Sequence, residues 1–449
     1  MRSFLLLAAM IGLVGCAPVE TPTQPETSAQ VSMNRFSGTP TPVIAARSNV
    51  DVASEFLDFH FKLESGRTIP NFSRFEGSIS IAYATQPNVL AASELNALVS
   101  RLRNEARVPI SIISPGQPAN IVISRISRAQ LNSVVRGAAC FVVPNAQDFA
   151  SLRGAGRDQI DWTQIRSRSR VGVFIPVGIS GQALRDCLHE EIAQALGPLN
   201  DLYRVPDTVF NDDNMHRVLT SYDMMILRTA YSSELRSGMS RNTVAARLPA
   251  ILARTNSRSS GFGTRNLPAS DQDWKIAIGK GLFSSSGNKS SINRAIALSQ
   301  SRQYGSARQA LGYFARGHAN AKNNREAAIN DFTQAYQLYA SEVGTRSIQA
   351  ARASLQLASV AISAGRVSEA ERIVDAGIDI SRGAQDAELL YNFQGLKALI
   401  AAAKGDSGRA QSLIRDAKGW AAYSIGTGRI FDEYFAILQN RIRQIEGQS

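Results

Sequence analysis

The chain has 449 residues and is 44% hydrophobic, and its 49 basic and 37 acidic side chains give a formal net charge of +12. The chain is longer than a single compact hydrophobic core usually supports, so we expect two domains. The basic residues are scattered through both halves, without a dense cluster or interleaved aromatic side chains. We therefore interpret the charge as a solvated surface and expect no nucleic-acid partner.

The first 16 residues have the pattern of an export signal. Arg2 precedes an apolar run that ends in Leu13-Val14-Gly15-Cys16, and this ending resembles the lipobox of bacterial lipoproteins. The resemblance implies cleavage before Cys16 and acylation of that residue. We then expect a lipid-anchored protein of the bacterial cell envelope that faces the periplasm. The alternative is an ordinary secretory signal that contains a cysteine.

Residues 17–50 are rich in Pro, Thr, Ser and Gln and are predicted to form a disordered tether. From residue 51 to residue 256 we predict an α+β domain, because strand signals come first and helical signals follow. The predicted strands span 77–83, 108–114, 119–124, 139–143 and 170–177. The predicted helices span 93–106, 184–195, 220–231 and 243–254.

Three cysteines are present. If Cys16 carries lipid, an even pair remains in an oxidising compartment. Cys140 lies in an apolar strand-like run and Cys187 begins a helix, so a disulfide between them would join the helix to the sheet. The alternative is two buried free thiols.

The run from Cys187 to Asp201 has the outline of a zinc-protease helix. Its marks are Cys187-Leu188, Glu190-Glu191, Gln194-Ala195-Leu196-Gly197 and Asn200-Asp201. Residues 69–256 resemble a bacterial family of secreted proteins of unknown function, which is similar in its core fold to zincin-like metallopeptidases. Aligned on the turn at Gly197, the resemblance implies zinc ligands at Glu190, Gln194 and Asn200, and a general base at Glu191.

None of these candidate ligand positions holds a histidine. The four histidines are His60, His189, His216 and His318, and no two stand four residues apart. The candidates Glu190, Gln194, Asn200 and the adjacent Asp201 offer oxygen donors, which suit calcium or magnesium better than zinc. The alternative is that they hydrogen-bond neighbouring loops. We assign no cofactor and expect a catalytically silent domain.

Residues 257–291 contain Ser- and Gly-rich clusters and are predicted to form a linker. Residues 292–446 are alanine-rich, lack proline and are predicted to be helical throughout. Related segments recur after 42 and then 40 residues, from Ala328 to Ala370 to Ala410. This spacing resembles the regular recurrence of helix pairs in tetratricopeptide repeats and predicts helical repeats. The alternative is a non-repeating bundle.

Two functions follow from these patterns. The first is an envelope lipoprotein that acts in binding or scaffolding, with a protein or peptide partner on the helical repeats. The second is an envelope hydrolase that uses Glu191 as base beside an atypical, oxygen-ligated metal. Metal content separates the two.

Overall fold

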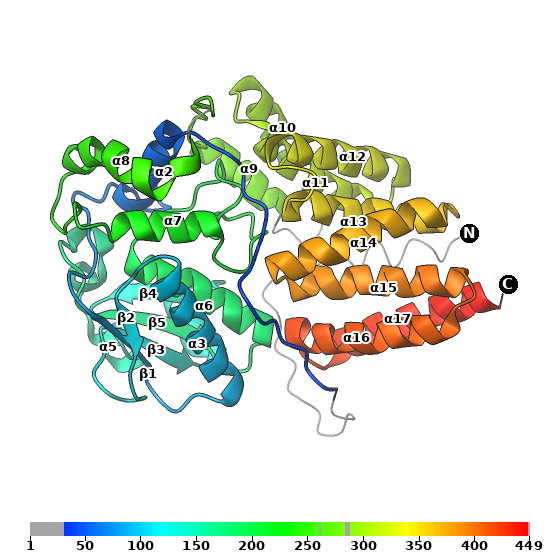
Figure 1. The fold of residues 1–449 in the computed structure, drawn as a ribbon, viewed down its shortest axis with the longest axis horizontal. Helices are drawn as coiled ribbons and strands as arrows, with labels where there is room; N and C mark the ends of the chain where they lie inside the picture. Colours follow the sequence, from blue (N-terminus) through cyan, green and yellow to red (C-terminus); the bar gives the residue numbers. More distant parts are fainter. Residues whose placement is uncertain (1–30, 260–261, 283–287, 448–449) are drawn as a thin grey trace. The chain divides into compact units, whose positions relative to one another are not determined.

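The computed structural model describes residues 31–259, 262–282 and 288–447 (Figure 1). The predicted signal peptide, the lipidation candidate Cys16 and residues 17–30 lie outside them. Within the described part of the chain, no helix is both long and apolar enough to cross a membrane.

The chain divides into two compact units. The α/β unit comprises Ala46–Asp212 and Arg217–Asn266. The helical unit comprises the described residues up to Ala45, the short segment Asp213–His216 and the chain from Leu267 onward. The helical unit thus begins within the predicted linker and also includes two segments from earlier in the chain.

A five-stranded sheet forms the centre of the α/β unit, in the order β2-β1-β3-β5-β4. The strands are β1 (Ile79–Tyr83), β2 (Ile110–Ile112), β3 (Ile121–Ile126), β4 (Phe141–Pro144) and β5 (Val171–Pro176). Each predicted strand is therefore present. Strands β2, β1, β3 and β5 are parallel, with Ile121 of β3 opposite Val171 of β5, and β4 pairs antiparallel with β5 at the edge.

Helices cover both faces of this sheet, so the unit is an α/β fold rather than the α+β fold that we predicted. One face packs Val171, Val173 and Ile175 against α3 (Val89–Asn104) and α6 (Gly181–Leu196). The other face packs Phe174 against α4 (Arg128–Val134) and α5 (Phe149–Gly154). Side chains alternate along a strand, and both sides of β5 are apolar. The two short helices had no clear sequence period.

Three more α-helices complete the unit: α2 (Asn49–Phe61), α7 (Ser221–Ala230) and α8 (Arg241–Thr255). Short 3₁₀ turns lie at Arg157–Ile160, Trp162–Gln164 and Ser257–Ser259. Helix α8 packs against both α2 and α7. Helix α2 is not among the predicted elements, and the Ser48 side chain caps its start by accepting from Asp51 N.

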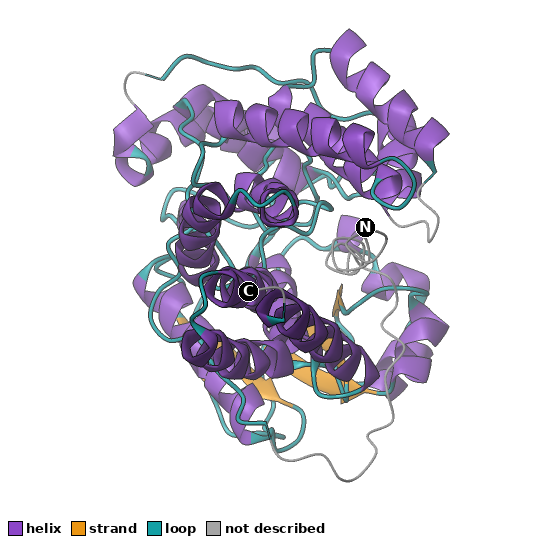
Figure 2. Ribbon diagram, turned by 90° about the vertical axis from the view of Figure 1, so that its right-hand side faces the viewer, coloured by secondary structure: helices purple, strands orange, loops and turns teal. Residues whose placement is uncertain are grey.

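Within the described residues, the helical unit contains nine helices and no strand. Figure 2 colours the helices of the chain purple and its strands orange. They are α9 (Gln272–Leu282), α10 (Lys289–Ser301), α11 (Ser306–Asn320), α12 (Arg325–Glu342), α13 (Ile348–Ser363), α14 (Val367–Ala384), α15 (Ala387–Ala403), α16 (Ser407–Ile425) and α17 (Arg429–Glu446). Each helix packs against the next in sequence, and α15 also contacts α13 and α17. Short connections and contacts of this kind are typical of antiparallel helix pairs.

Small residues let these helices approach each other. A Cβ atom at Gly377 of α14 would overlap the ring of Phe393 on α15, and one at Gly395 would lie 2.6 Å from the hydroxyl of Tyr434. Helix α15 is buried along nearly its whole length, which places it at the centre of the unit.

Part of the predicted disordered tether packs on the helical unit. Residues 31–45, which we call the strap, lack regular secondary structure and bind helices far away in sequence. Thr41 N donates to Gly383 O at 2.7 Å, and Asn34 N donates to Gly419 O at 3.1 Å. The composition predicted that this stretch cannot form its own core. It does not exclude docking on another part of the chain.

Candidate functional site

Helix α6 positions the residues singled out by sequence. The Ser180 side chain caps its start by accepting from Ala183 N at 3.3 Å. Its apolar residues Leu184, Leu188 and Ile192 are buried in the main core. The spacing of these residues over one face fixes which side of the helix meets the sheet.

The end of α6 is held by a buried arginine and by helix α2. Arg168 donates to the carbonyl oxygens of Gln194, Ala195 and Gly197, groups that a helix C-terminus leaves unpaired. At the turn, a Cβ on Gly197 would lie 2.9 Å from Nε2 of His60. Glycine is therefore required there for close packing.

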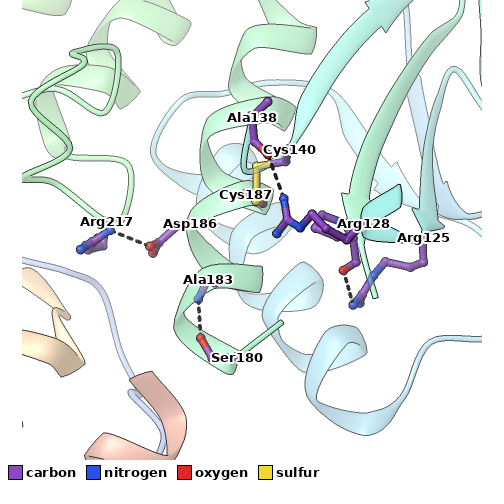
Figure 3. Close-up of a disulfide and its surroundings, with 10 residues drawn as sticks. Arg125, Arg128, Ala138, Cys140, Ser180, Ala183, Asp186, Cys187 and Arg217 are labelled. Carbon is purple, nitrogen blue, oxygen red and sulfur yellow. Dashed lines mark hydrogen bonds and ion pairs between the residues drawn. A yellow bond between two sulfur atoms is a disulfide. The ribbon is translucent and has the colours of Figure 1, made fainter. Parts of the chain in front are cut away.

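A disulfide joins α6 to the chain just before β4. Cys140 and Cys187 are bonded, with their Cα atoms 5.9 Å apart and a sequence separation of 47 (Figure 3). This is the pairing that the sequence analysis preferred over two free thiols. It links the helix to the antiparallel edge of the sheet.

Five acidic residues gather beside α6, and we call them the carboxylate cluster: Glu64, Glu190, Glu191, Asp201 and Asp212. One carboxylate oxygen from each of Glu64, Asp201 and Asp212 lies within 4.8 Å of the other two. Glu190 and Glu191 interact electrostatically with Glu64. Glu191 and Asp201 are buried, Glu190 and Asp212 are half-buried, and Glu64 is exposed.

The charges within the cluster repel one another. Burial, followed by the charges of Glu64 and Asp212, raises the pKa of Glu190 to about 8. Burial and the neighbouring carboxylates Glu190 and Glu64 raise the pKa of Glu191 well above its ordinary value. Burial and Glu64 do the same to the pKa of Asp201. Among the described residues, no lysine or arginine forms an ion pair with these three acids.

Three local structures bring the cluster together. Helix α6 carries Glu190 and Glu191. Glu64 lies on a tight turn in which Leu63 N bonds Arg67 O at 2.9 Å and Gly66 has a positive φ of 83°. The loop between α6 and α7 carries Asp201 and Asp212, and Leu202 N bonds Phe210 O across it at 2.9 Å.

The other two predicted ligands have different surroundings. The amide nitrogen of Asn200 donates to the backbone oxygen of Asp58 at 3.0 Å, so this residue holds the turn to α2. Gln194 contributes its backbone oxygen to Arg168, and it is not among the three acids whose oxygens converge. The structure thus brings together Glu190, Glu191 and Asp201.

Zinc does not fit these residues. His189 accepts a hydrogen bond from Leu219 N at Nδ1, and burial lowers its pKa well below the ordinary value. His60 bonds the Phe56 carbonyl oxygen through Nδ1, and Cys187 is in the disulfide. The converging atoms are carboxylate oxygens, whereas zinc in proteins favours nitrogen and sulfur donors.

Sequence reasoning missed Glu64 and Asp212 as members of the cluster. Asp212 follows Phe210 and Asn211 in the loop after α6, in a stretch with no apolar period to place it. Glu64 precedes a Ser-Gly pair typical of a turn. Neither signal says that the residue lies beside α6.

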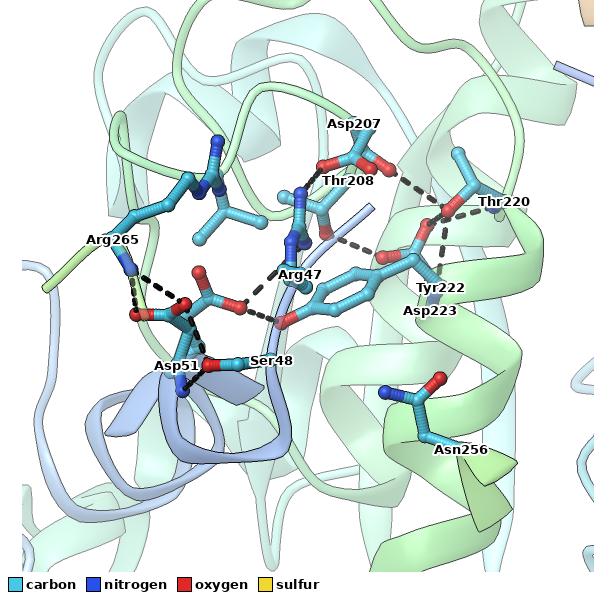
Figure 4. Close-up of polar contacts among 12 residues, drawn as sticks. Arg47, Ser48, Asp51, Asp207, Thr208, Thr220, Tyr222, Asp223, Asn256 and Arg265 are labelled. Carbon is cyan, nitrogen blue, oxygen red and sulfur yellow. Dashed lines mark hydrogen bonds and ion pairs between the residues drawn. The ribbon is translucent and has the colours of Figure 1, made fainter. Parts of the chain in front are cut away.

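A buried polar network fixes the loop that carries Asp201 and Asp212 (Figure 4). Arg47 pairs with Asp207 and, at 3.6 Å, with Glu55. The Tyr222 hydroxyl donates to Glu55 at 2.6 Å, and Thr220 donates to the Asp207 carbonyl oxygen at 2.9 Å. Because opposite charges and hydrogen bonds compensate here, the network is structural.

The strap marks a second candidate site, on the helical unit. The Phe36 ring lies 4.4 Å from the Trp420 ring on α16, centroid to centroid. The Asn34 amide donates to the Asp416 carboxylate at 2.9 Å, and Gln385 donates to the Gly38 carbonyl oxygen at 3.0 Å. Aromatic, side-chain and backbone contacts therefore all anchor this peptide.

Residues 49–250 match the model of one protein family, described as a protein of unknown function (DUF2927). The matched segment covers most of the α/β unit and, of the helical unit, includes only Asp213–His216. No curated protein and no solved structure matches the chain.

Proposed function

We propose that the protein is a lipid-anchored cell-envelope protein that acts by binding or scaffolding. In this proposal, lipid on Cys16 holds it to a membrane, and the helical unit binds a protein or peptide partner. The α/β unit is a zincin-like domain that lacks peptidase activity. The lipobox-like sequence supports the anchor, and the oxygen-only donor set supports the absence of zinc chemistry.

The strap is the observation that carries the binding role. Fifteen residues without regular structure follow helices α16 and α14, using backbone hydrogen bonds to Gly419 and Gly383. Backbone hydrogen bonds do not depend on side-chain identity, while the Phe36 contact with Trp420 selects an aromatic residue. The same surface therefore suits an extended peptide from another protein with an aromatic residue at the equivalent position.

The test measures peptide binding in trans. A protein that begins at Ala46 is titrated with a fluorescent peptide of residues 31–45, and binding is followed by fluorescence polarisation. We expect saturable binding, and binding about tenfold or more weaker to the full chain because its own strap competes. A scrambled peptide controls for composition.

Two glycine variants in α16 provide a matched comparison. A Cβ at Gly419 would lie 2.7 Å from Asn34 of the strap, whereas the nearest atom to a Cβ at Gly408 is 3.9 Å away. We expect Gly419→Ala to weaken peptide binding and Gly408→Ala to leave it unchanged. Absence of saturable binding to the shortened protein would remove the proposed role.

The alternative function is an envelope hydrolase with Glu191 as its acid–base residue. One observation favours it: the Glu191 side chain is only 5% exposed, and its Oε2 atom has no hydrogen-bond partner. Burial, followed by the charges of Glu190 and Glu64, raises the pKa of Glu191 well above its ordinary value, which disfavours the ionised form that a base needs unless a cation lies nearby. Hydrolysis of peptides or cell-wall material that is abolished by Glu191→Gln would establish this alternative.

A further inference from the structure

We propose that the carboxylate cluster binds one hard divalent cation of the calcium class. The site would be formed by Glu64, Asp201 and Asp212, with Glu190 and Glu191 beside them. It lies within the α/β unit, so the inference stands apart from peptide binding by the helical unit.

The spacing of the oxygens fits a single ion. Calcium binds protein oxygens at about 2.3–2.6 Å, so two ligands of one ion are separated by at most about 5 Å. The three oxygens of Glu64, Asp201 and Asp212 lie within 4.8 Å of one another. All three can therefore contact one ion without a rearrangement of the backbone.

Buried oxygens without partners are the second, independent observation. Asp201 is 5% exposed, and its Oδ1 atom has no hydrogen-bond partner. Glu191 is equally buried and has an unpartnered Oε2. A buried polar atom without a partner costs about 1–3 kcal/mol, and more when it is charged. A cation would satisfy these oxygens and offset the repulsion within the cluster.

The donor set selects the class of ion. Every nearby donor in the cluster is a carboxylate oxygen, which favours hard cations over zinc or copper. Five carboxylates provide more oxygens than the octahedral shell of magnesium uses, and calcium accepts six to eight oxygens in flexible geometry. Two of the contributing segments lack helix and strand structure, and calcium tolerates the irregular ligand geometry that such segments offer.

Binding would connect three separate segments: the turn at Glu64, helix α6 and the loop between α6 and α7. The disulfide and Arg168 already hold one side and the end of α6. The cation would complete this fixation at the remaining face, and a tighter unit should unfold at higher temperature.

The experiment uses the full chain, stripped with EDTA and then dialysed. Calcium chloride is titrated at pH 7.5 by calorimetry, and thermal unfolding is compared at 1 mM calcium and in EDTA. We expect one ion per chain and a rise of about 3 °C or more in the unfolding midpoint of the α/β unit. Magnesium and zinc are titrated in parallel.

Two pairs of variants separate ligation from general charge effects. Glu64→Gln changes an exposed ligand without disturbing the core, and Glu234→Gln is its control on the same unit. Asp201→Asn changes a buried ligand, and the exposed Asp158→Asn is its control. We expect each ligand variant to lose about tenfold or more in calcium affinity and each control to retain it.

Several results would overturn the proposal. One is the absence of both heat and a midpoint shift with the unmodified chain in 5 mM calcium. Another is unchanged calcium affinity in Glu64→Gln. Tighter binding of zinc or magnesium than of calcium would refute the assigned class of ion.

Discussion

Replacing Glu190 with glutamine should stabilise the α/β unit when no divalent cation is present. Burial, Glu64 and Asp212 raise the pKa of this side chain from 4.5 to about 8. At pH 7 the folded chain therefore keeps the carboxyl group protonated, while the unfolded chain releases the proton. Glutamine is neutral in both states and has nearly the same shape, so the variant avoids this cost.

The magnitude follows from the pKa difference. The pH of 7 lies about 2.5 pH units above the ordinary pKa of 4.5. Keeping this carboxyl group protonated in the folded chain therefore lowers the free energy of unfolding by about 3.4 kcal/mol. Because Glu190 is half-buried, water screens part of the repulsion, and we expect a gain of about 2 kcal/mol. Because the pKa of Glu190 is higher in the folded chain than in the unfolded chain, the unmodified protein has its full stability below pH 4.5 and loses stability as the pH rises toward 8. The gain should therefore be near zero at pH 4.5 and largest above pH 8.

The assay is urea unfolding in EDTA at pH 4.5, 7 and 8.5. Trp162 belongs to the α/β unit, whereas Trp274 and Trp420 belong to the helical unit. A background that carries Trp274→Phe and Trp420→Phe leaves fluorescence from Trp162 alone, which reports the α/β unit. Glu234→Gln, at a half-buried position on the same unit, is the control; it removes only the ion pair with the exposed Arg254 and should change stability by less than about 1 kcal/mol.

A loss of stability at pH 7 in Glu190→Gln would refute the electrostatic reasoning. So would a gain that is the same at pH 4.5 and pH 8.5, because such a gain could not come from a titrating carboxyl group.

Three further predictions concern the scaffold. Replacing both cysteines of the disulfide, as Cys140→Ser and Cys187→Ser, should lower the free energy of unfolding by about 4 kcal/mol, because the bond closes a loop of 47 residues. Urea unfolding measures this loss. Gly377→Ala should destabilise the helical unit by about 1–3 kcal/mol through overlap with Phe393, which lowers its thermal midpoint. Burial lowers the pKa of His318 to about 4, so helical-unit stability should fall as the pH drops from 6.5 toward 4, by up to about 1.4 kcal/mol per pH unit.

Each of these predictions has a control that can contradict it. Reduction of the unmodified chain should reproduce the cysteine variants. Gly408→Ala lies at an open position in α16 and should be neutral or stabilising; equal damage at both glycines would argue against overlap. His318→Gln should flatten the pH dependence of the helical unit between pH 4 and 6.5. If the slope persists, other groups cause it.

The sequence determined most of the elements. Runs of isoleucine and valine predicted all five strands, and the apolar spacing predicted α3, α6, α7 and α8 to within a few residues. The strand period of two residues and the helix period of 3.6 residues involve only residues that are close in sequence, so a single sequence is enough to reveal them. The helical character of the C-terminal part also follows from its alanine-rich, proline-free composition.

The tertiary structure alone decided the strand order, the two-sided cover of the sheet and the path of the strap. It also decided the membership of the carboxylate cluster. Sequence placed Glu190, Glu191 and Asp201 near one another because they share a helix and the loop after it. Glu64 comes from a distant turn, and its approach depends on how α2 packs beside the end of α6. Contact across such a separation, and the burial that shifts a pKa, are set by packing, which local sequence patterns do not encode.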